Sequence, residues 1–370
     1  MIREEFEIIA IAAMVAATCA LPGVFLVLRR QALLSDAISH AILLGIVLAF
    51  FVTEDLASPL LVLAAAATGV LTVSLVELLE RTRRVREDAA IGLVFPALFS
   101  AGVILISRYA GSVHLDVDAV LLGELVFAPF NRLEWGGVDL GPRILWLMGA
   151  ILLLNLLFLA LFYKELKLTT FDAGLAAALG FAPGVVHYAF MVLVSVTAVG
   201  AFDAVGSVLV VALMIAPPAA AYLLTDRLPR LLALSVALGV LSALSGYALA
   251  YRLDASVSGS MATMSGVWFA AALLFAPRRG VLAQLRRRRR QRWEFAQQML
   301  TLHLLNHEAT DAAGEENREA HLHEHLRWEA AFAARVVRRA ERRGLLRYGE
   351  GDRLLLTERG RVQARALVEA

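Results

Sequence analysis

Hydrophobic residues in this chain gather into long runs that short polar segments separate. A helix needs roughly 20 mostly apolar residues to cross about 30 Å of hydrocarbon. About nine runs approach or exceed this length, at residues 8–28, 34–52, 58–79, 91–106, 143–163, 185–201, 205–224, 231–251 and 257–275. The pattern predicts an all-α polytopic membrane protein with about nine transmembrane helices.

The sixth and seventh runs are separated only by Phe202, Asp203 and Ala204, which favours a tight hairpin of broken helices. Asp203 is consistent with a solvated turn or with a site residue in the membrane. Pro217 and Pro218 lie inside the seventh run and predict a kink or an unwound segment there.

Composition supports residence in a bilayer. Of the 370 residues 59% are hydrophobic and 18% are charged, and the net charge is only +2. The single cysteine excludes a disulfide framework and a cysteine zinc site within one chain.

The distribution of arginine and lysine predicts the orientation of the spans. With nine spans, the basic residues near 29–30, 81–86, 164–167, 227–230 and 278–279 all fall on one side. The positive-inside rule makes that side cytoplasmic. We expect a multi-pass protein of the cytoplasmic (inner) membrane, with the N-terminus outside and the C-terminus inside.

The composition changes after Pro277 and predicts a second domain. We expect residues 1–280 to form a transmembrane domain, residues 281–292 a basic linker and residues 293–370 a soluble cytoplasmic domain. Residues 293–306, 321–326 and 328–343 are expected to be helical, followed by a hairpin of residues 345–347 and 353–356. Thr357 is positioned to cap a last helix. This order is typical of a small α+β winged-helix-like domain.

Asp36 and His40 are four residues apart near the start of the second run, so they share one face of a helix. Ionisable residues inside a membrane usually face a partner or an aqueous pathway, and a carboxylate with an imidazole suits Mn²⁺, Fe²⁺ or Zn²⁺. The alternative is an interfacial Asp36 that pairs with Arg29 or Arg30. Glu124 is a further candidate ligand or, equally, a residue of an external loop.

Residues 171–181, FDAGLAAALGF, lie on the predicted cytoplasmic side. Asp172 can cap a short helix and Gly180 can end it. Such a helix can serve as a contact for an ATPase or as a plain connector. The sequence contains no G-x-x-x-x-G-K-[ST] loop, so ATP hydrolysis would come from another subunit. The chain is expected to be a transport subunit, not an enzyme.

Four stretches together resemble the permeases of zinc, manganese and iron ABC importers. They are RQALLSDAISHA at 30–41, EDAAIGLVF at 87–95, KELKLTTFDAGLAAALG at 164–180 and AVGSVLVVALMIAPPAAAYLLT at 204–225. The resemblance implies a transported divalent metal ion at Asp36 and His40 and no bound cofactor. It also implies an extracytoplasmic metal-binding protein, a second permease copy or paralogue, and ABC ATPase subunits that grip the segment containing Phe171, Asp172, Ala176 and Gly180.

The C-terminal domain resembles the winged-helix part of iron- and manganese-dependent repressors, through residues 345–347 and LTERGRVQARALV at 356–368. Arginines along residues 335–343 are compatible with DNA phosphate contacts or with a solvated protein-binding helix. A regulatory metal site is a further hypothesis, which rests on the histidines at positions 303, 307, 321, 323 and 325.

The sequence therefore favours the membrane permease of an ATP-driven importer of divalent transition-metal ions. Manganese is preferred, and zinc and iron stay open. The alternative is a membrane-tethered, metal-responsive regulator that acts through its winged helix.

Overall fold

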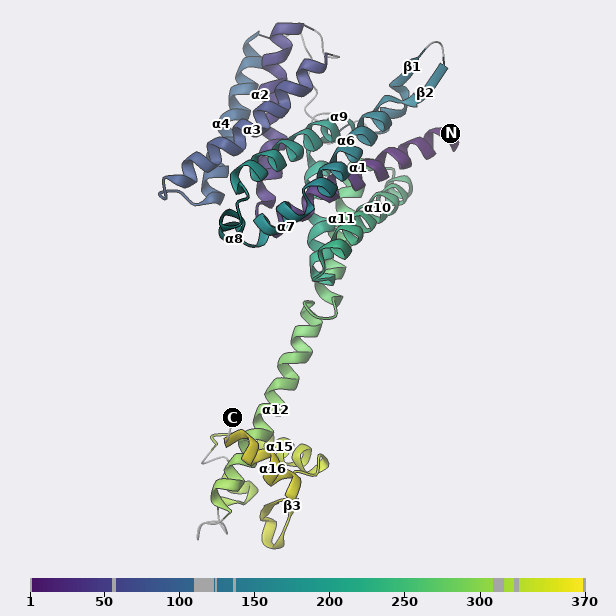
Figure 1. The fold of residues 1–370 in the computed structure, drawn as a ribbon. Helices are drawn as coiled ribbons and strands as arrows, with labels where there is room; N and C mark the ends of the chain where they lie inside the picture. Colours follow the sequence, from purple (N-terminus) through teal and green to yellow (C-terminus); the bar gives the residue numbers. More distant parts are fainter. Residues whose placement is uncertain are drawn as a thin grey trace. The chain divides into compact units, whose positions relative to one another are not determined.

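The computed structural model describes residues 2–54, 58–109, 123, 125–135, 138–308, 316–322 and 326–368. The chain divides into two compact units, Met1–Gly280 and Val281–Ala370. We call them the membrane unit and the C-terminal unit and describe each by itself (Figure 1).

The membrane unit is built from long apolar helices. The described residues contain nine helices that are long and apolar enough to cross a membrane, as predicted. They belong to α1 (Ile2–Leu28), α2 (Ala32–Thr53), α3 (Pro59–Arg81), α4 (Glu87–Tyr109), α6 (Arg143–Leu161), α9 (Pro183–Leu224), α10 (Leu228–Leu253) and α11 (Val257–Phe275), and α9 supplies two of the nine.

Helix α1 lies at the centre of the membrane unit and α4 at its edge. Of the most hydrophobic 18 residues of each helix, 72% are buried in α1 and 22% in α4. Helix α1 packs on α6, α9 and α10, whereas α2, α3 and α4 lie side by side (Figure 1). The exposed leucines of α3 and α6 suit contact with lipid, which is as apolar as they are.

Small residues allow the central helices to approach closely. A Cβ added to Gly23 of α1 would lie 2.1 Å from the carbonyl oxygen of Met214 in α9. A Cβ on Gly246 of α10 would lie 2.4 Å from Cα of Met261 in α11. Close backbone contact replaces the hydrophobic effect as the source of helix association in a membrane.

Helix α9 breaks at Gly206, close to the predicted break between the sixth and seventh runs. Gly206 has φ 73° and ψ 167°, a conformation that a residue with a Cβ rarely adopts. The unwound segment predicted at Pro217 and Pro218 was wrong, because the helix continues through both prolines. Proline's own φ fits a helix, and helices in membranes tolerate the lost hydrogen bond when neighbours satisfy the backbone.

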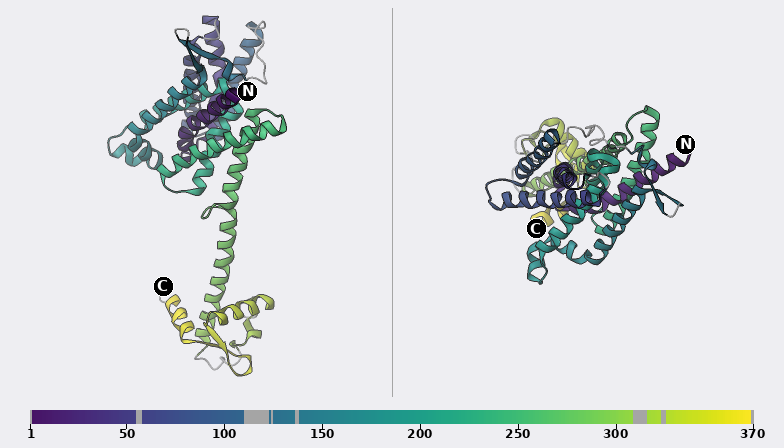
Figure 2. Two further views of the ribbon diagram at one scale, coloured as in Figure 1. Left: turned by 90° about the vertical axis from the view of Figure 1, so that its right-hand side faces the viewer. Right: turned by 90° about the horizontal axis from the view of Figure 1, so that it is seen from above.

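A two-stranded hairpin that the sequence did not predict precedes α6. Strand β1 (Arg132–Trp135) pairs antiparallel with β2 (Val138–Pro142), after the short helix η1 (Ala128–Phe130). Arg132 binds Asp139 within the hairpin at 2.7 Å and Glu7 of α1 at 3.0 Å. The hairpin lies beside the N-terminal end of α1 in Figure 1 and in both views of Figure 2.

Two short helices connect α6 to α9. Helix α7 (Tyr163–Phe171) is followed by α8 (Ala173–Ala178), and the side chain of Asp172 accepts a hydrogen bond from the backbone N–H of Leu175 at 2.8 Å. Gly180 follows with φ +86°. The cap at Asp172 and the turn at Gly180 confirm the predicted short helix.

The C-terminal unit has a small core of its own. Its elements are α12 (Val281–His307), η2 (Glu319–His321), α15 (Ala330–Arg342), β3 (Leu346–Tyr348), η3 (Glu350–Asp352), β4 (Leu354–Leu356) and α16 (Glu358–Val368). Leu300, Val336 and Leu354 are fully enclosed in this core. The hairpin and the Thr357 cap are confirmed, the latter by a 3.2 Å bond from the Gly360 N–H.

Two details of the C-terminal unit differ from expectation. Helix α12 begins at Val281, so residues 281–292, which were predicted as a basic linker, are helical. Long arginine side chains have good helix propensity, which explains this extension. The helix expected at residues 321–326 starts earlier, as the 3₁₀ turn Glu319–His321, and residues 323–325 lie outside the described part.

Candidate functional site

Asp36 and His40 form a pair on α2, as the sequence predicted. His40 Nε2 lies 3.4 Å from Asp36 Oδ1, and the two side chains are 27% and 40% exposed. The pair arises from local geometry, because residues four apart on a helix lie one above the other. Both side chains keep an open side on which a further ligand or an ion can bind.

The surroundings of this pair combine aromatic rings with small hydroxyls. The His40 ring lies 5.9 Å from the ring of Phe95 and 6.1 Å from that of Phe99, both on α4. The buried hydroxyls of Ser35 and Ser39 donate to carbonyls of their own helix at 2.8 Å. Arg29, which the interfacial alternative pairs with Asp36, instead donates to Thr169 and Thr170 of α7.

The donor set of a single chain is small. Among the described residues, no group of three or more His, Cys, Asp or Glu side chains is arranged to hold a metal ion. Glu124 and the side chain of Asp203 lie outside the described part. One imidazole and one carboxylate are donors that Mn²⁺, Fe²⁺ and Zn²⁺ accept, but these ions take four to six ligands.

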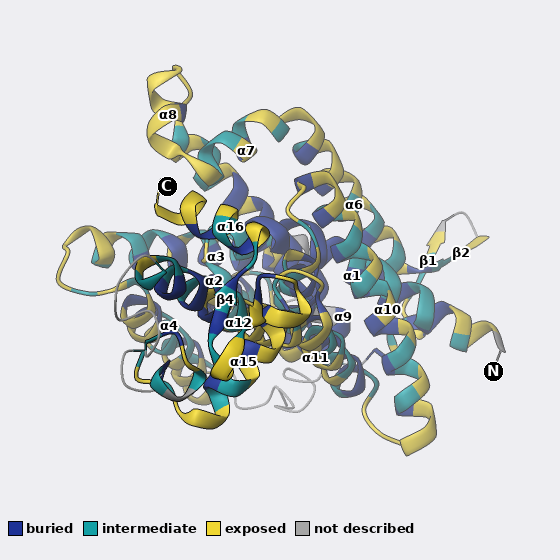
Figure 3. Cartoon of the chain, turned by 90° about the horizontal axis from the view of Figure 1, so that it is seen from below, coloured by how far each residue is buried: buried dark blue, intermediate teal, exposed yellow. Residues whose placement is uncertain are grey.

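The short helix α8 presents an apolar surface. Phe171, Leu175 and Leu179 are 63%, 48% and 61% exposed, whereas Ala176 is fully buried against the membrane unit. Figure 3 shows most of α8 as exposed ribbon. Apolar side chains that are exposed side by side are typical of protein contact sites.

The histidines of the C-terminal unit come together only in part. The rings of His303 and His307 on α12 lie 4.6 Å apart, and His303 Nε2 lies 3.4 Å from the carbonyl oxygen of Glu316. His307 Nδ1 contacts the carboxylate of Glu316. His321 ends η2, whereas His323 and His325 lie outside the described residues.

Several arginines of α15 face their own unit. The Arg339 guanidinium lies 4.0 Å from the ring centre of Trp293 on α12, and that of Arg335 lies 5.9 Å from it. Arg343 donates to Gln297 at 3.0 Å. Residues 293–370 also balance 12 arginines with 13 aspartates and glutamates. All four arginines of α15 are nevertheless exposed, which is compatible with DNA phosphate contacts or with a protein-binding helix.

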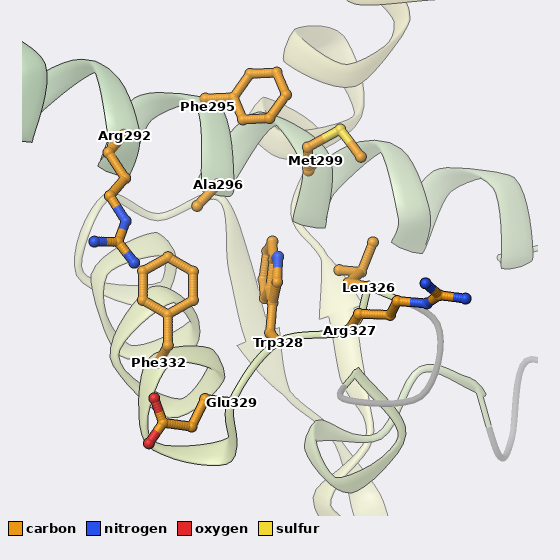
Figure 4. A pocket seen from close by; sticks show the side chains of 9 residues that line it. All are labelled: Arg292, Phe295, Ala296, Met299, Leu326, Arg327, Trp328, Glu329 and Phe332. Carbon is orange, nitrogen blue, oxygen red and sulfur yellow. The ribbon is translucent and has the colours of Figure 1, made fainter.

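A cavity of about 550 Å³ opens between α12 and the beginning of α15 (Figure 4). Trp328 and Phe332 meet edge to face with their ring centres 5.5 Å apart, and Arg292 lies 4.9 Å from the Phe332 ring centre. The sequence did not indicate this cavity, because its walls come from α12 and from residues 326–332, which are distant from each other in the sequence. It lies within the C-terminal unit, whereas Asp36 and His40 lie within the membrane unit.

The sequence also missed His187 and Tyr188, at the beginning of α9. His187 Nε2 lies 2.5 Å from Oε1 of Glu77 on α3, and the Tyr188 hydroxyl donates to Oε2 of Glu77 at 2.7 Å. Glu77 also pairs with Arg81, four residues later on the same helix, at 3.7 Å.

Comparisons with known proteins agree with this geometry. The profile described as ABC 3 transport family matches residues 4–276. The zinc transport system membrane protein TroD of Treponema pallidum is 50% identical over 363 residues, which are 98% of each chain. The manganese transport system membrane protein MntD of Bacillus subtilis is 50% identical over 280 residues, 76% of this chain and 95% of MntD.

A solved structure has a similar fold. The structure of PsaBC from Streptococcus pneumoniae in complex with Fab matches with a TM-score of 0.62 at 26% identity, covering 75% of this chain and 98% of that one. The similarity to TroD extends over almost the whole chain, whereas the match to MntD is as long as the membrane unit alone.

Proposed function

Because the chain belongs to the ABC 3 transport family, we propose that it is the membrane-spanning subunit of an ATP-driven importer of divalent transition-metal ions. The observation that carries this proposal is the Asp36–His40 pair on α2, with its 3.4 Å spacing and its open side. The relatives are named for metals that a carboxylate and an imidazole can bind: TroD is named as a zinc transport protein and MntD as a manganese transport protein.

The ion is the cargo of the protein, and the pair is suited to a transient site. Two protein donors bind a divalent ion more weakly than a closed structural site with four ligands. A transport site must bind well enough to accept the ion and weakly enough to release it. We infer that the ion passes Asp36 and His40 while keeping part of its water shell.

A second permease subunit is part of this proposal. Two copies, or a copy and a paralogue, would contribute two carboxylates and two imidazoles and so reach the four ligands that Zn²⁺ prefers. An extracytoplasmic metal-binding protein would deliver the ion. Arginine placement supports a cytoplasmic C-terminus and an external N-terminus, with the β1–β2 hairpin on the delivery side.

Separate ATPase subunits would supply the energy, because the sequence contains no phosphate-binding loop. The exposed apolar face of α8, held by the Asp172 cap and the Gly180 turn, supports its assignment as their contact. Phe171 and Leu175 would insert into the ATPase, whereas Ala176 would hold α8 on the membrane unit.

The test is uptake by the complete complex in proteoliposomes, supplied with ATP inside and the external binding protein outside. We expect an ATP-binding subunit to co-purify with the chain, and we expect vanadate to stop uptake of radioactive Mn²⁺, Zn²⁺ or Fe²⁺. Competition among the three ions would identify the cargo. Uptake that continues without ATP would contradict the proposal and indicate an ion-coupled secondary transporter.

A second function is favoured by the C-terminal unit, whose hairpin and helices follow the order of a winged helix. In this alternative the chain is a membrane-tethered, metal-responsive regulator. The contacts of Arg339 and Arg343 with α12 hold α15 in its own unit, and the exposed arginines of α15 suit either a protein or a DNA partner. Nine spans also exceed what an anchor requires.

A further inference from the structure

Four separate segments of the membrane unit meet at one polar cluster, which we call the Arg29 cluster. It consists of Arg29 after α1, Glu77 on α3, Thr169 and Thr170 at the end of α7, and His187 and Tyr188 at the beginning of α9. Polar groups of this kind are costly to bury unless they are bonded, so their pairing fixes the positions of all four segments.

Arg29 is the hub of this cluster. Its Nε donates to the Thr170 hydroxyl at 3.1 Å, and its Nη2 donates to the Thr169 hydroxyl at 3.2 Å. Its Nη1 lies 3.2 Å from Nδ1 of His187. Burial lowers the pKa of Arg29 to about 10, so the guanidinium remains charged at neutral pH.

Glu77 completes the cluster from the side of α3. Its two carboxylate oxygens hold His187 and Tyr188, so α9 is tied to α3 through Glu77 and to α1 through Arg29. A metal-release site is a poor interpretation of the Glu77–His187 pair. The guanidinium groups of Arg29 and Arg81 lie 3.2 Å from the histidine and 3.7 Å from the carboxylate, and they would repel a cation.

The position of the cluster along the chain connects it to α8. Thr169 and Thr170 directly precede the Phe171–Asp172 cap of α8, and His187 lies in the first turns of the next helix, α9. Both ends of α8 therefore run into bonds of the same cluster. Apart from the buried Ala176, the residues of α8 are exposed, so a force on α8 reaches the rest of the unit through Ala176 and through these two ends.

The other end of the connection is α2. Arg29 and Arg30 form a tight turn in which the Gln31 N–H donates to the Leu26 carbonyl at 2.8 Å, and α2 begins at Ala32. Asp36 lies seven residues after Arg29. A short turn has few conformations available, so it transmits a displacement of α1 to α2 where a flexible loop would absorb the displacement.

The cluster also has room to rearrange. A cavity of about 370 Å³ borders Arg29, Glu77, Gly184 and His187. This space, which is open on one side, leaves the guanidinium and the carboxylate room to change position. Two distant sites are coupled when both shift the equilibrium of a structural element that can adopt two arrangements.

We propose that the Arg29 cluster couples movement of α8 to α2, and that Arg29 and Glu77 are positioning residues which link ATP hydrolysis to release of the ion at Asp36 and His40. This inference rests on the proposed function, in which α8 is the ATPase contact. The cluster acts through α8 and α2 and does not itself touch the cargo.

The test compares ATP hydrolysed with ions transported by the complete complex in proteoliposomes. For Arg29→Ala we expect an ATPase rate close to wild type and a rise of about tenfold in ATP used per ion, the size of a typical coupling between sites. Arg29→Lys should restore only part of the coupling, because one ammonium cannot reach the two threonines and His187 together. Arg84→Ala, an exposed arginine near the same end of α3, should keep the wild-type ratio.

The double variant Thr169→Val, Thr170→Val provides a second test in case Arg29→Ala does not fold. It keeps Arg29 and replaces only the hydroxyls to which Arg29 donates. It too should raise the ratio of ATP to ion. If Arg29→Ala keeps the wild-type ratio of ATP hydrolysed to ions transported, the coupling role is overturned. Where Arg29→Ala does not assemble, the same result in the double variant overturns it. A wild-type complex that fails to use ATP for uptake would contradict the proposed function itself.

Discussion

At the scale of single residues, the charged side chains outside the membrane helices are stabilised by specific partners. Arg361 of α16 holds Glu308, the residue after α12, through Nε at 3.0 Å and Nη2 at 2.6 Å. Hydrogen bonding to this guanidinium holds the pKa of the Glu308 carboxyl below its ordinary range. A lowered carboxyl pKa stabilises the folded state at neutral pH, and that contribution is lost as pH falls through the lowered pKa.

The first prediction concerns this pair. Glu308→Gln should reduce the local stability of α16 by about 1 kcal/mol at pH 7, a modest value because both side chains are about a third exposed. The difference from wild type should begin to narrow near about pH 4.3, the ordinary pKa of glutamate, where the unfolded segment becomes protonated, and should vanish below the lowered pKa of the folded carboxyl. Hydrogen exchange of the α16 peptide, corrected for the intrinsic rate at each pH, measures both effects.

Glu358→Gln is the matched control, because Glu358 also contacts Arg361, at 3.2 Å, but is 82% exposed. It should change exchange in α16 by only a few tenths of a kcal/mol. A pH-independent loss in Glu308→Gln, or an equal loss in the control, would show that the carboxylate charge does not matter.

The residues that could be predicted are those whose neighbours are close in sequence. Asp36 and His40 pair because they are one helical turn apart, and Asp172 caps its own helix. His187 could not be predicted, since Arg29 is 158 residues away and is brought near only by packing of α1 on α9. The geometry of the Arg29 cluster is a property of the tertiary structure.

At the scale of elements, close contact between helix backbones organises the membrane unit. Gly23 allows α1 to meet α9 at the Met214 carbonyl, and this contact lies in the most buried helix of the unit. A side chain there would force the two helices apart, because neither backbone can move without displacing its other neighbours.

The second prediction follows from that contact. Gly23→Ala should lower the stability of the membrane unit by about 1 to 3 kcal/mol, the usual cost of overpacking. Gly149→Ala on α6 is the control, because a Cβ there meets no atom within 4 Å. Thermal unfolding of both variants in detergent checks the prediction. Equal midpoints for the two variants would mean that the α1–α9 contact is not tight.

Helix positions were predictable from hydrophobic length, whereas irregular elements were not. All nine spans follow from runs of apolar residues, and the Thr357 cap follows from its sequence position. The β1–β2 hairpin was missed, although Gly136 and Gly137 between Trp135 and Val138 are a common two-residue hairpin signal. The break in α9 at Gly206 lies close to the one predicted from the sequence, whereas the unwound segment predicted at Pro217 and Pro218 is absent, since tertiary packing decides whether a proline unwinds a membrane helix.

At the scale of the whole molecule, the membrane unit and the C-terminal unit are joined in one chain. Each has its own buried core, and the core of the C-terminal unit includes Leu300, Val336 and Leu354. The match to MntD is as long as the membrane unit alone, whereas that to TroD includes almost all of the chain. We infer that the C-terminal unit adds a regulatory or interaction function to a complete permease.

The third prediction is that the membrane unit works without the C-terminal unit. Deletion of the residues after Arg286 should leave uptake by the reconstituted complex within about twofold of wild type at saturating ion, because units with separate cores fold independently. Regulation of uptake by the ion concentration inside the vesicle should be lost. Complete loss of uptake in a truncated complex that still assembles would indicate instead that the C-terminal unit is the working part.

The last and most direct measurement is radioactive metal uptake by complexes that carry Asp36→Ala or His40→Ala. The account predicts that either substitution lowers uptake at least tenfold, roughly the cost of disturbing a metal site, while the subunits still assemble. Asp88→Asn, an exposed carboxylate at the beginning of α4, should transport like wild type. Uptake that is unchanged in both Asp36→Ala and His40→Ala would contradict the assignment of this pair to the path of the ion.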